Sequence, residues 1–135
     1  MSLILKIVSK EQIAACKYIP DEHTVSLRDN GIWYALEKNG ILVSFLCIRV
    51  QRNELYIGEV FTAQKYRKRG YFFRLLDYVV NTIYAGYSIS THALITSKNG
   101  FLACGFKQFA FRRFKYGDQY WLRREGKKWQ GQELK

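Results

Sequence analysis

The middle of the chain contains runs of apolar, β-branched and aromatic residues, a composition typical of β-strands. Two β-rich runs, residues 32–37 and 41–50, flank Lys38-Asn39-Gly40, and Asn-Gly between two such runs is a strong hairpin signal. A further run, residues 55–62, follows a turn at Arg52-Asn53. We therefore expect an antiparallel meander in this part of the chain.

The spacing of apolar residues changes to a helical period after Gly70. Positions 72, 75, 76, 79, 80 and 83 are apolar, with polar residues on the other face, so we predict an amphipathic helix packed on a sheet. Residues 88–95 return to a strand pattern, and residues 97–104 leave room for a short helix.

The end of the chain predicts a final hairpin, formed by residues 106–116 and 119–124 around a turn at 116–118. In the first of these strands the apolar positions change parity after Phe111. This change predicts a β-bulge near Arg112-Arg113.

The start of the chain predicts a short helix over residues 10–19, which Ser9 would cap and Pro20 would close. Residues 21–31 are expected to form a loop. The apolar run before Ser9 is too short for a signal peptide, and nowhere do 18 apolar residues run together. We therefore expect no membrane span.

The composition fits one domain with a strongly basic surface. A chain of 135 residues, 48% of them hydrophobic, can fill a single core. The net charge of +11 favours an anionic partner, for which a coenzyme, a nucleic acid and an acidic protein all qualify. A basic surface that serves only solubility is the alternative.

Cys16, Cys47 and Cys104 are odd in number and lie in apolar stretches, as is typical of free thiols in a reducing compartment. They show no metal-ligand spacing, so we expect no metal site. Together with the missing signal peptide, these thiols favour a cytoplasmic location.

A basic turn between a strand and the amphipathic helix carries most of the chemical information. Residues 59–71 contain the strand end, the cations Lys65, Arg67, Lys68 and Arg69, and Gly70. Unpaired N–H groups at a helix start favour an anion, and a glycine lets a phosphate approach the backbone closely. The segment predicts a phosphate site; a solvated loop is the alternative.

The order of elements around this turn resembles that of the GCN5-related N-acetyltransferase (GNAT) family. Another strand follows the helix, and after it come Asn99 and Cys104-Gly105-Phe106. Members of the family carry an Arg/Gln-x-x-Gly-x-Gly/Ala turn that holds the pyrophosphate of coenzyme A, and a Gly-Phe that opens the next-to-last strand.

The resemblance implies an α/β (α+β) fold. We expect a single GNAT-like acyltransferase domain over residues 1–125 and a polar tail over residues 126–135. The domain would contain a mixed, mostly antiparallel central sheet of about six to seven strands flanked by helices.

The resemblance also implies acetyl-coenzyme A, or another acyl-coenzyme A, as the cofactor. The backbone of Val60, Phe61 and Thr62 would pair with the pantetheine arm, and splayed neighbouring strands would admit the thioester. Asn99 is a further residue expected at the coenzyme. The pyrophosphate would be held by the amides of Arg67, Lys68, Arg69, Gly70, Tyr71 and Phe72.

Two positions depart from the family pattern. The second small residue of the turn falls on Phe72, whose bulk lies where a Gly or Ala leaves room beside the phosphates. The tyrosine acid found in many members falls on Phe101, which has no proton to give the departing thiolate. An acid, if one is required, must come from elsewhere.

Acyl transfer to an amine needs a base for the amine and a proton for the thiolate. Glu59 is the first candidate base because it lies on the strand expected to contact the cofactor; a surface carboxylate paired with a cation is the alternative. His92 lies on the next strand and titrates in the useful range, although a structural histidine fits equally. Tyr116 and Tyr120 are candidate acids or packing residues.

A second basic cluster occupies the final hairpin, where aromatic residues are interleaved with cations. Such a surface suits nucleic acid, because cations meet phosphates and exposed rings stack on unpaired bases. The alternative is a hairpin with its aromatic residues inward and its cations outward. The cations concerned are Arg112, Arg113, Lys115, Arg123 and Arg124.

Three functions remain open at this stage. The first is an acyl-coenzyme A-dependent N-acyltransferase acting on a small amine, a peptide or an aminoacyl group. The second is a GNAT-like protein that binds or modifies nucleic acid, similar to the phage Mom-like DNA-modifying proteins, with an eroded coenzyme site. The third is a noncatalytic binding module. The turn from Arg67 to Gly70 favours the first, whereas Phe72 and Phe101 favour the others.

Overall fold

The computed structural model describes residues 3–16, 31–115 and 117–126. The helix predicted over residues 10–19 is shorter than expected, because α1 ends at Ala14 with Ala15 as its C-cap. Most of the predicted loop, Tyr116 and most of the predicted tail lie outside the described ranges. The elements in chain order are β1 (Leu3–Val8), α1 (Lys10–Ala14), β2 (Ile32–Lys38), β3 (Ile41–Gln51), β4 (Glu54–Thr62), the 3₁₀ turn η1 (Gln64–Tyr66), α3 (Tyr71–Tyr78), the π-helical turn η2 (Val79–Ile83), β5 (Ile89–Ala93), α4 (Ile95–Ala103), β6 (Lys107–Arg112) and β7 (Gln119–Arg124).

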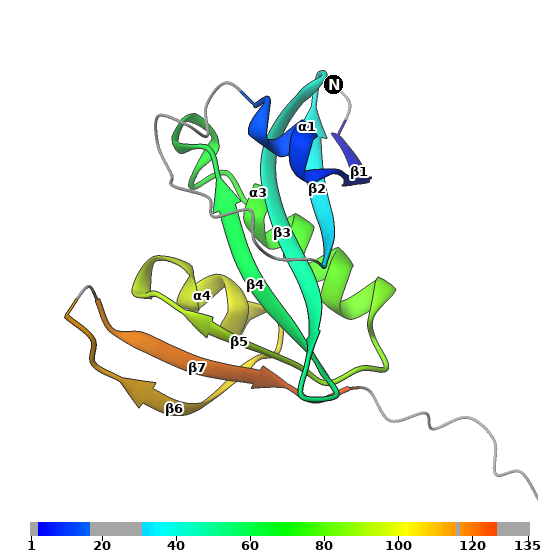
Figure 1. Cartoon of the computed structure of the whole chain (residues 1–135). Coiled ribbons are helices and arrows are strands. Elements are labelled where there is room, and N and C mark those ends of the chain that lie inside the picture. The colour runs from blue at the N-terminus through cyan, green and yellow to red at the C-terminus, as the bar shows by residue number, and fades with distance from the viewer. Residues whose placement is uncertain (1–2, 17–30, 116, 127–135) are drawn as a thin grey trace, which may run out of the picture.

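The seven strands form one sheet in the order β1-β2-β3-β4-β5-β7-β6 (Figure 1). Neighbouring strands are antiparallel except β4 and β5, which run parallel. The mixed, mostly antiparallel sheet expected from the sequence is therefore confirmed. Strand β7 lies between β5 and β6, so the final hairpin extends the sheet beyond β5.

The predicted turns of the meander are confirmed by their backbone conformation. Asn39 and Gly40 have φ angles of 51° and 83°, and Arg52 and Asn53 have φ angles of 53° and 63°. Two consecutive left-handed residues give a two-residue hairpin the twist that its strands require. Turn chemistry alone therefore placed both connections correctly.

The first strand, β1, is an edge strand that the sequence pattern did not predict. It pairs with β2 along its whole length. The predicted cap of the following helix is confirmed: the Ser9 hydroxyl accepts a hydrogen bond from the Gln12 backbone N–H, and the Gln12 side chain accepts one from the Ser9 N–H. This capping box satisfies N–H groups that the start of α1 would otherwise leave unpaired.

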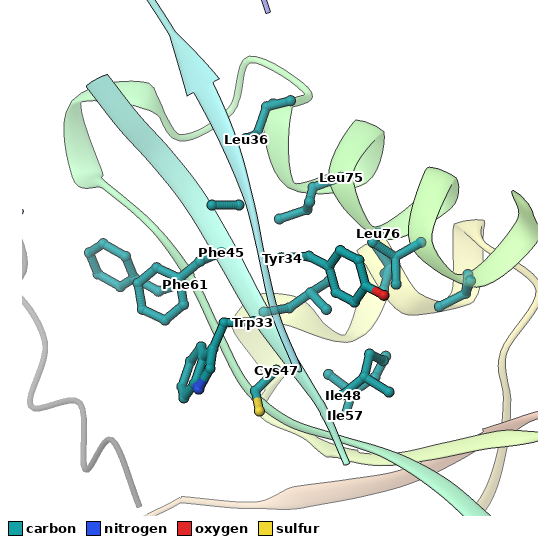
Figure 2. Close-up of a cluster of buried hydrophobic side chains, with 14 of the residues drawn as sticks. Trp33, Tyr34, Leu36, Phe45, Cys47, Ile48, Ile57, Phe61, Leu75 and Leu76 are labelled. Carbon is teal, nitrogen blue, oxygen red and sulfur yellow. The ribbon is translucent and has the colours of Figure 1, made fainter. Parts of the chain in front are cut away.

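Helices α3 and α4 pack on the sheet and on each other: α3 contacts β2, β3 and β4, whereas α4 contacts β5 and β7. Figure 2 shows Leu75 and Leu76 of α3 facing the strands near Tyr34, while Trp33 and Phe45 gather on the other side of the strands. In this central part of the sheet, apolar side chains are therefore buried on both faces. The predicted amphipathic helix is confirmed and continues through η2.

The predicted bulge near Arg112-Arg113 is wrong. The register between β6 and β7 shifts between Gln108 and Ala110, which makes Phe109 the extra residue, with its ring 6.2 Å from that of Trp121. The change of parity had a different cause: β6 ends at Arg112, so the apolar residues after it no longer follow a strand period.

Candidate functional site

Strands β4 and β5 separate part-way along their length. Their ladder runs from Leu55–Ile89 to Ile57–Thr91, and no later pair joins them in the part of the chain that the structure describes. Strand β4 continues to Thr62, while β5 pairs with β7 on its other side. Figure 1 shows the two strands diverging. Beyond Ile57, strand β5 no longer pairs with β4.

A β-bulge in β4 coincides with this separation. Two residues of β4, Gly58 and Glu59, lie opposite the single residue Cys47 of β3. A bulge bends its strand and increases the local twist, which accounts for the departure of β4 from β5 immediately after Ile57. Glu59 is half-buried at this bend.

The turn between β4 and α3 ends in an open helix start. Gly70 precedes α3 with a φ of 80°, and no side chain caps the helix. The Arg74 N–H donates to the Gly70 carbonyl (3.0 Å). The N–H groups of residues 71–73, at the start of the helix, therefore have no partner within the helix. A Cβ at Gly70 would meet nothing within 4 Å. This arrangement suits a phosphate.

The cations of the turn are exposed and divide into two groups. Arg67 folds back on β4, where its Nε donates to the carbonyl of Thr62 (2.8 Å) and its guanidinium lies 5.8 Å from the Phe61 ring. This bond braces the turn against the strand end. The others keep their charge available to an anion, because no ion pair joins them to a described acid: Lys65, Lys68, Arg69 and Arg74.

The predicted coenzyme residues on β4 have side chains that belong to the fold. Val60 is half-buried, Phe61 is buried, and the Thr62 hydroxyl lies 2.8 Å from that of Ser44. Any coenzyme contact from this strand therefore falls to its main chain. Asn99 lies exposed on α4.

The two residues that depart from the family pattern pack against each other. The rings of Phe72 and Phe101 meet edge to face, with centroids 5.6 Å apart. Phe72 is turned toward Gly100 on α4 and leaves the space beside Gly70 open. Phe101 is only 1% exposed and also contacts Phe106, so it is a core residue. The bulk of Phe72 therefore does not fill the space beside the turn at Gly70.

His92 lies one residue beyond the last β4–β5 ladder pair and belongs to a row of rings across the sheet. It stacks on Trp121 (4.5 Å) and meets the edge of Tyr56 (5.4 Å). Arg49 and Arg112 extend the row over Tyr56 and Trp121, at 4.8 and 5.2 Å. Burial lowers the pKa of His92, so its imidazole is neutral at neutral pH. Two of the predicted catalytic residues, Glu59 and His92, thus lie where the strands separate.

One of the five predicted nucleic-acid cations, Arg124, is structural, and the prediction is wrong for it. Arg124 is 4% exposed and donates to Asn81 and to two backbone carbonyls after η2, at 2.7–2.9 Å. Arg123 pairs with Glu54 (2.7 Å) and Glu125. The two residues are neighbours on β7, so their side chains point to opposite faces of the sheet, and only that of Arg124 is buried.

The other cations of the hairpin share their surface with exposed rings. On β6 and just after it, the aromatic side chains do not point into a core, contrary to the pattern of aromatics inward and cations outward. Exposed here are Phe109 (58%), Phe111 (39%), Phe114 (50%), Arg112, Arg113 and Lys115.

The three cysteines are free thiols, as expected. Burial, supported by the nearby Asp77, raises the pKa of Cys104 to about 12, which suits packing and not nucleophilic chemistry. Within the described ranges, no three or more His, Cys, Asp or Glu side chains come together as metal ligands. No helix there has the length and apolar character needed to cross a membrane.

Comparison with known proteins agrees with this geometry. The family model described as the acetyltransferase (GNAT) family matches residues 6–111. The chain belongs to this family. A comparison of the sequence with curated proteins found no significant match.

Solved structures with the same fold span nearly the whole GNAT domain. The ribosomal-protein-S18-alanine N-acetyltransferase from Escherichia coli superposes with a TM-score of 0.77 at 13% identity, covering 98% of this chain and 100% of that one. A putative streptothricin acetyltransferase from Bacillus anthracis, in complex with acetyl coenzyme A, gives 0.71 at 15%, covering 94% and 100%. Arabidopsis thaliana Naa50, in complex with a bisubstrate analogue, gives 0.73 at 15%, covering 93% and 99%.

Two features of this GNAT domain were missed in the sequence although each carries a signal. Gly58 is an isolated glycine inside a strand pattern, which indicates a bulge. Gly100 is an isolated glycine inside a helix, which indicates close packing. Both lie at the site: the first at the β4 bend and the second against Phe72.

Proposed function

We propose that this GNAT chain is an N-acetyltransferase that uses acetyl-coenzyme A to acetylate an amine. The observation that carries the proposal is the separation of β4 from β5, next to an open, cation-rich start of α3. Membership of the acetyltransferase family supports it. When bound, acetyl-coenzyme A supplies a thioester whose carbonyl carbon accepts the amine.

The residues of the turn fit the coenzyme. The amides of residues 67–72 would hold the pyrophosphate, with the exposed cations offsetting its charge. The main chain of Val60, Phe61 and Thr62 would pair with the pantetheine arm, since β5 no longer pairs with β4 there. Asn99, exposed on α4, would be a further contact.

Glu59 and His92 are the proposed bases, because the acceptor must lose a proton to become a nucleophile. The lowered pKa of His92 keeps its imidazole neutral and able to accept that proton. Glu59 lies at the β4 bend, on the other strand. Tyr116 stays a candidate acid, and it lies outside the described residues. The acceptor would be a small amine, a peptide or an aminoacyl group.

Calorimetric titration with acetyl-coenzyme A tests the proposal. The wild type should bind, and Gly70→Glu should not, because a carboxylate at the turn blocks the phosphates by bulk and charge. Gly40→Glu is the matched control: Gly40 has a similar φ of 83° and equally open surroundings, but lies in the β2–β3 turn. A wild type that fails to bind would refute the use of this coenzyme.

A second candidate is nucleic-acid binding through the β6 surface, favoured by the exposed rings beside Arg112, Arg113 and Lys115. This function would be compatible with an eroded coenzyme site. Affinity for single-stranded DNA or RNA should then fall steeply as salt rises, since each phosphate contact releases counterions. Absence of binding at low salt would exclude this candidate.

A further inference from the structure

Phe72 occupies a position from which its side chain could obstruct the phosphate turn. It is the second residue of α3, directly after Gly70 and Tyr71. Side chains on a helix lean toward its N-terminus, so the surface that such a residue covers lies over the preceding turn. In this protein the ring of Phe72 instead lies against α4.

Gly100 is what makes room for the ring on α4. A Cβ at Gly100 would lie 2.7 Å from Cε2 and 2.9 Å from Cδ2 of Phe72. Contacts this short are not tolerated, so even the methyl group of alanine would force the ring to move. Phe101, whose ring Phe72 contacts edge to face, lies next to Gly100 on α4. The two aromatic residues and the glycine therefore form one packing unit.

The backbone gives no other reason for a glycine at this position. Gly100 lies inside α4, and its φ is outside the left-handed region that favours glycine. Alanine is the better helix former at such a position. The glycine therefore works against the helix, and the observed gain is space for Phe72.

We propose that Gly100 is a positioning residue for coenzyme binding: by accepting the Phe72 ring on α4, it keeps the turn at Gly70 open. This inference rests on the proposed use of acetyl-coenzyme A. It explains how a GNAT turn functions with phenylalanine where the family pattern has glycine or alanine. The large residue at 72 and the missing side chain at 100 compensate each other.

The test is Gly100→Ala, examined by titration with acetyl-coenzyme A. A ring displaced toward the turn should raise the dissociation constant about tenfold or more. Gly86→Ala is the matched control, because a Cβ there would meet nothing within 4 Å, and its affinity should equal that of the wild type. A purely structural role would predict no selective loss of affinity in a variant that still folds.

The double variant Phe72→Ala/Gly100→Ala separates a displaced ring from a damaged helix. With the ring removed, the alanine at 100 has no clash, so affinity should return to within about twofold of Phe72→Ala alone. A double variant as weak as Gly100→Ala would overturn the inference. So would wild-type affinity in Gly100→Ala.

A measurement without coenzyme keeps the inference testable if the proposed function fails. Aromatic rings shift the NMR signals of nearby amides, so Gly100→Ala should move the amide signals of residues 67–70, and the double variant should restore them. Unmoved signals would overturn the inference. If the wild type does not bind acetyl-coenzyme A, the proposed function is refuted. The NMR signals of residues 67–70 then still show whether Gly100 holds the Phe72 ring away from the turn.

Discussion

Substitution of Arg124 should destabilise the fold far more than substitution of its neighbour in sequence, the partly exposed Arg123. Its guanidinium is buried and donates three hydrogen bonds, to Asn81 and to the carbonyls of Tyr84 and Tyr87. These bonds tie β7 to the end of the α3–η2 helix. The Nε atom is buried without a hydrogen-bond partner among the described residues, which offsets part of the gain.

Arg124→Ala removes all of these bonds and leaves a gap between β7 and the end of the α3–η2 helix. Hydrogen bonds from a charged donor contribute more than neutral ones, but water can reach carbonyls near the exposed Tyr87. We therefore expect a loss of about 3 kcal/mol. For a domain of this size, that corresponds to a fall in melting temperature of roughly 10 °C.

Arg123→Ala is the matched control, because it removes the same side chain from the neighbouring position. Arg123 and Glu54 have side chains that are 37% and 31% exposed, so their ion pair is screened by water and should contribute about 0.5 kcal/mol. Arg124→Lys should not rescue the first variant, since one ammonium cannot reach three separate acceptors. Melting followed by circular dichroism measures all three variants. Equal losses for Arg123→Ala and Arg124→Ala would refute the reasoning.

Three further predictions follow from burial. The pKa of His92 in the folded state is lowered, so its contribution to stability is complete above the unfolded pKa of about 6.5 and is lost as the pH falls through the folded pKa. His92→Phe should therefore weaken the dependence of the melting temperature on pH below pH 6.5, and an unchanged slope would contradict this. With its pKa near 12, Cys104 should react with a thiol reagent far more slowly than the half-buried Cys16 at pH 8; equal rates would show that Cys104 is accessible. Phe101→Ala should cost about 3–5 kcal/mol in denaturant unfolding, and Phe101→Tyr should not raise kcat; a higher kcat would place residue 101 at the chemistry.

The features that the sequence predicted correctly depend on neighbours along the chain. The Asn39-Gly40 turn, the Ser9 capping box and the helical period after Gly70 each depend on residues within a few positions of one another. The basic turn between β4 and α3 is of the same kind. Its glycine, its cations and the helix that follows are contiguous, so the sequence alone predicted a basic turn that leads into a helix.

The misplaced features depend on contacts between distant segments. The residues around Arg123 and Arg124 in the sequence did not distinguish the two. The position of β7 between β5 and β6 buries Arg124 and pairs Arg123 with Glu54. The bulge was placed at Arg112 and not at Phe109 because the strand end is not marked in the apolar pattern. Strand β1 was missed because its partner, β2, lies across α1 and the following segment.

The sequence by itself determined the local pieces of this protein: turns, caps, periods and a charged helix start, all of which depend on short-range backbone conformation and periodicity. Only the tertiary structure decided that β4 and β5 separate at the Gly58-Glu59 bulge and bring Glu59 and His92 to that point. It also decided that Phe72 turns to Gly100 and leaves the turn open. The physical reason is that burial and packing are properties of the assembled sheet and helices, and no single segment contains them.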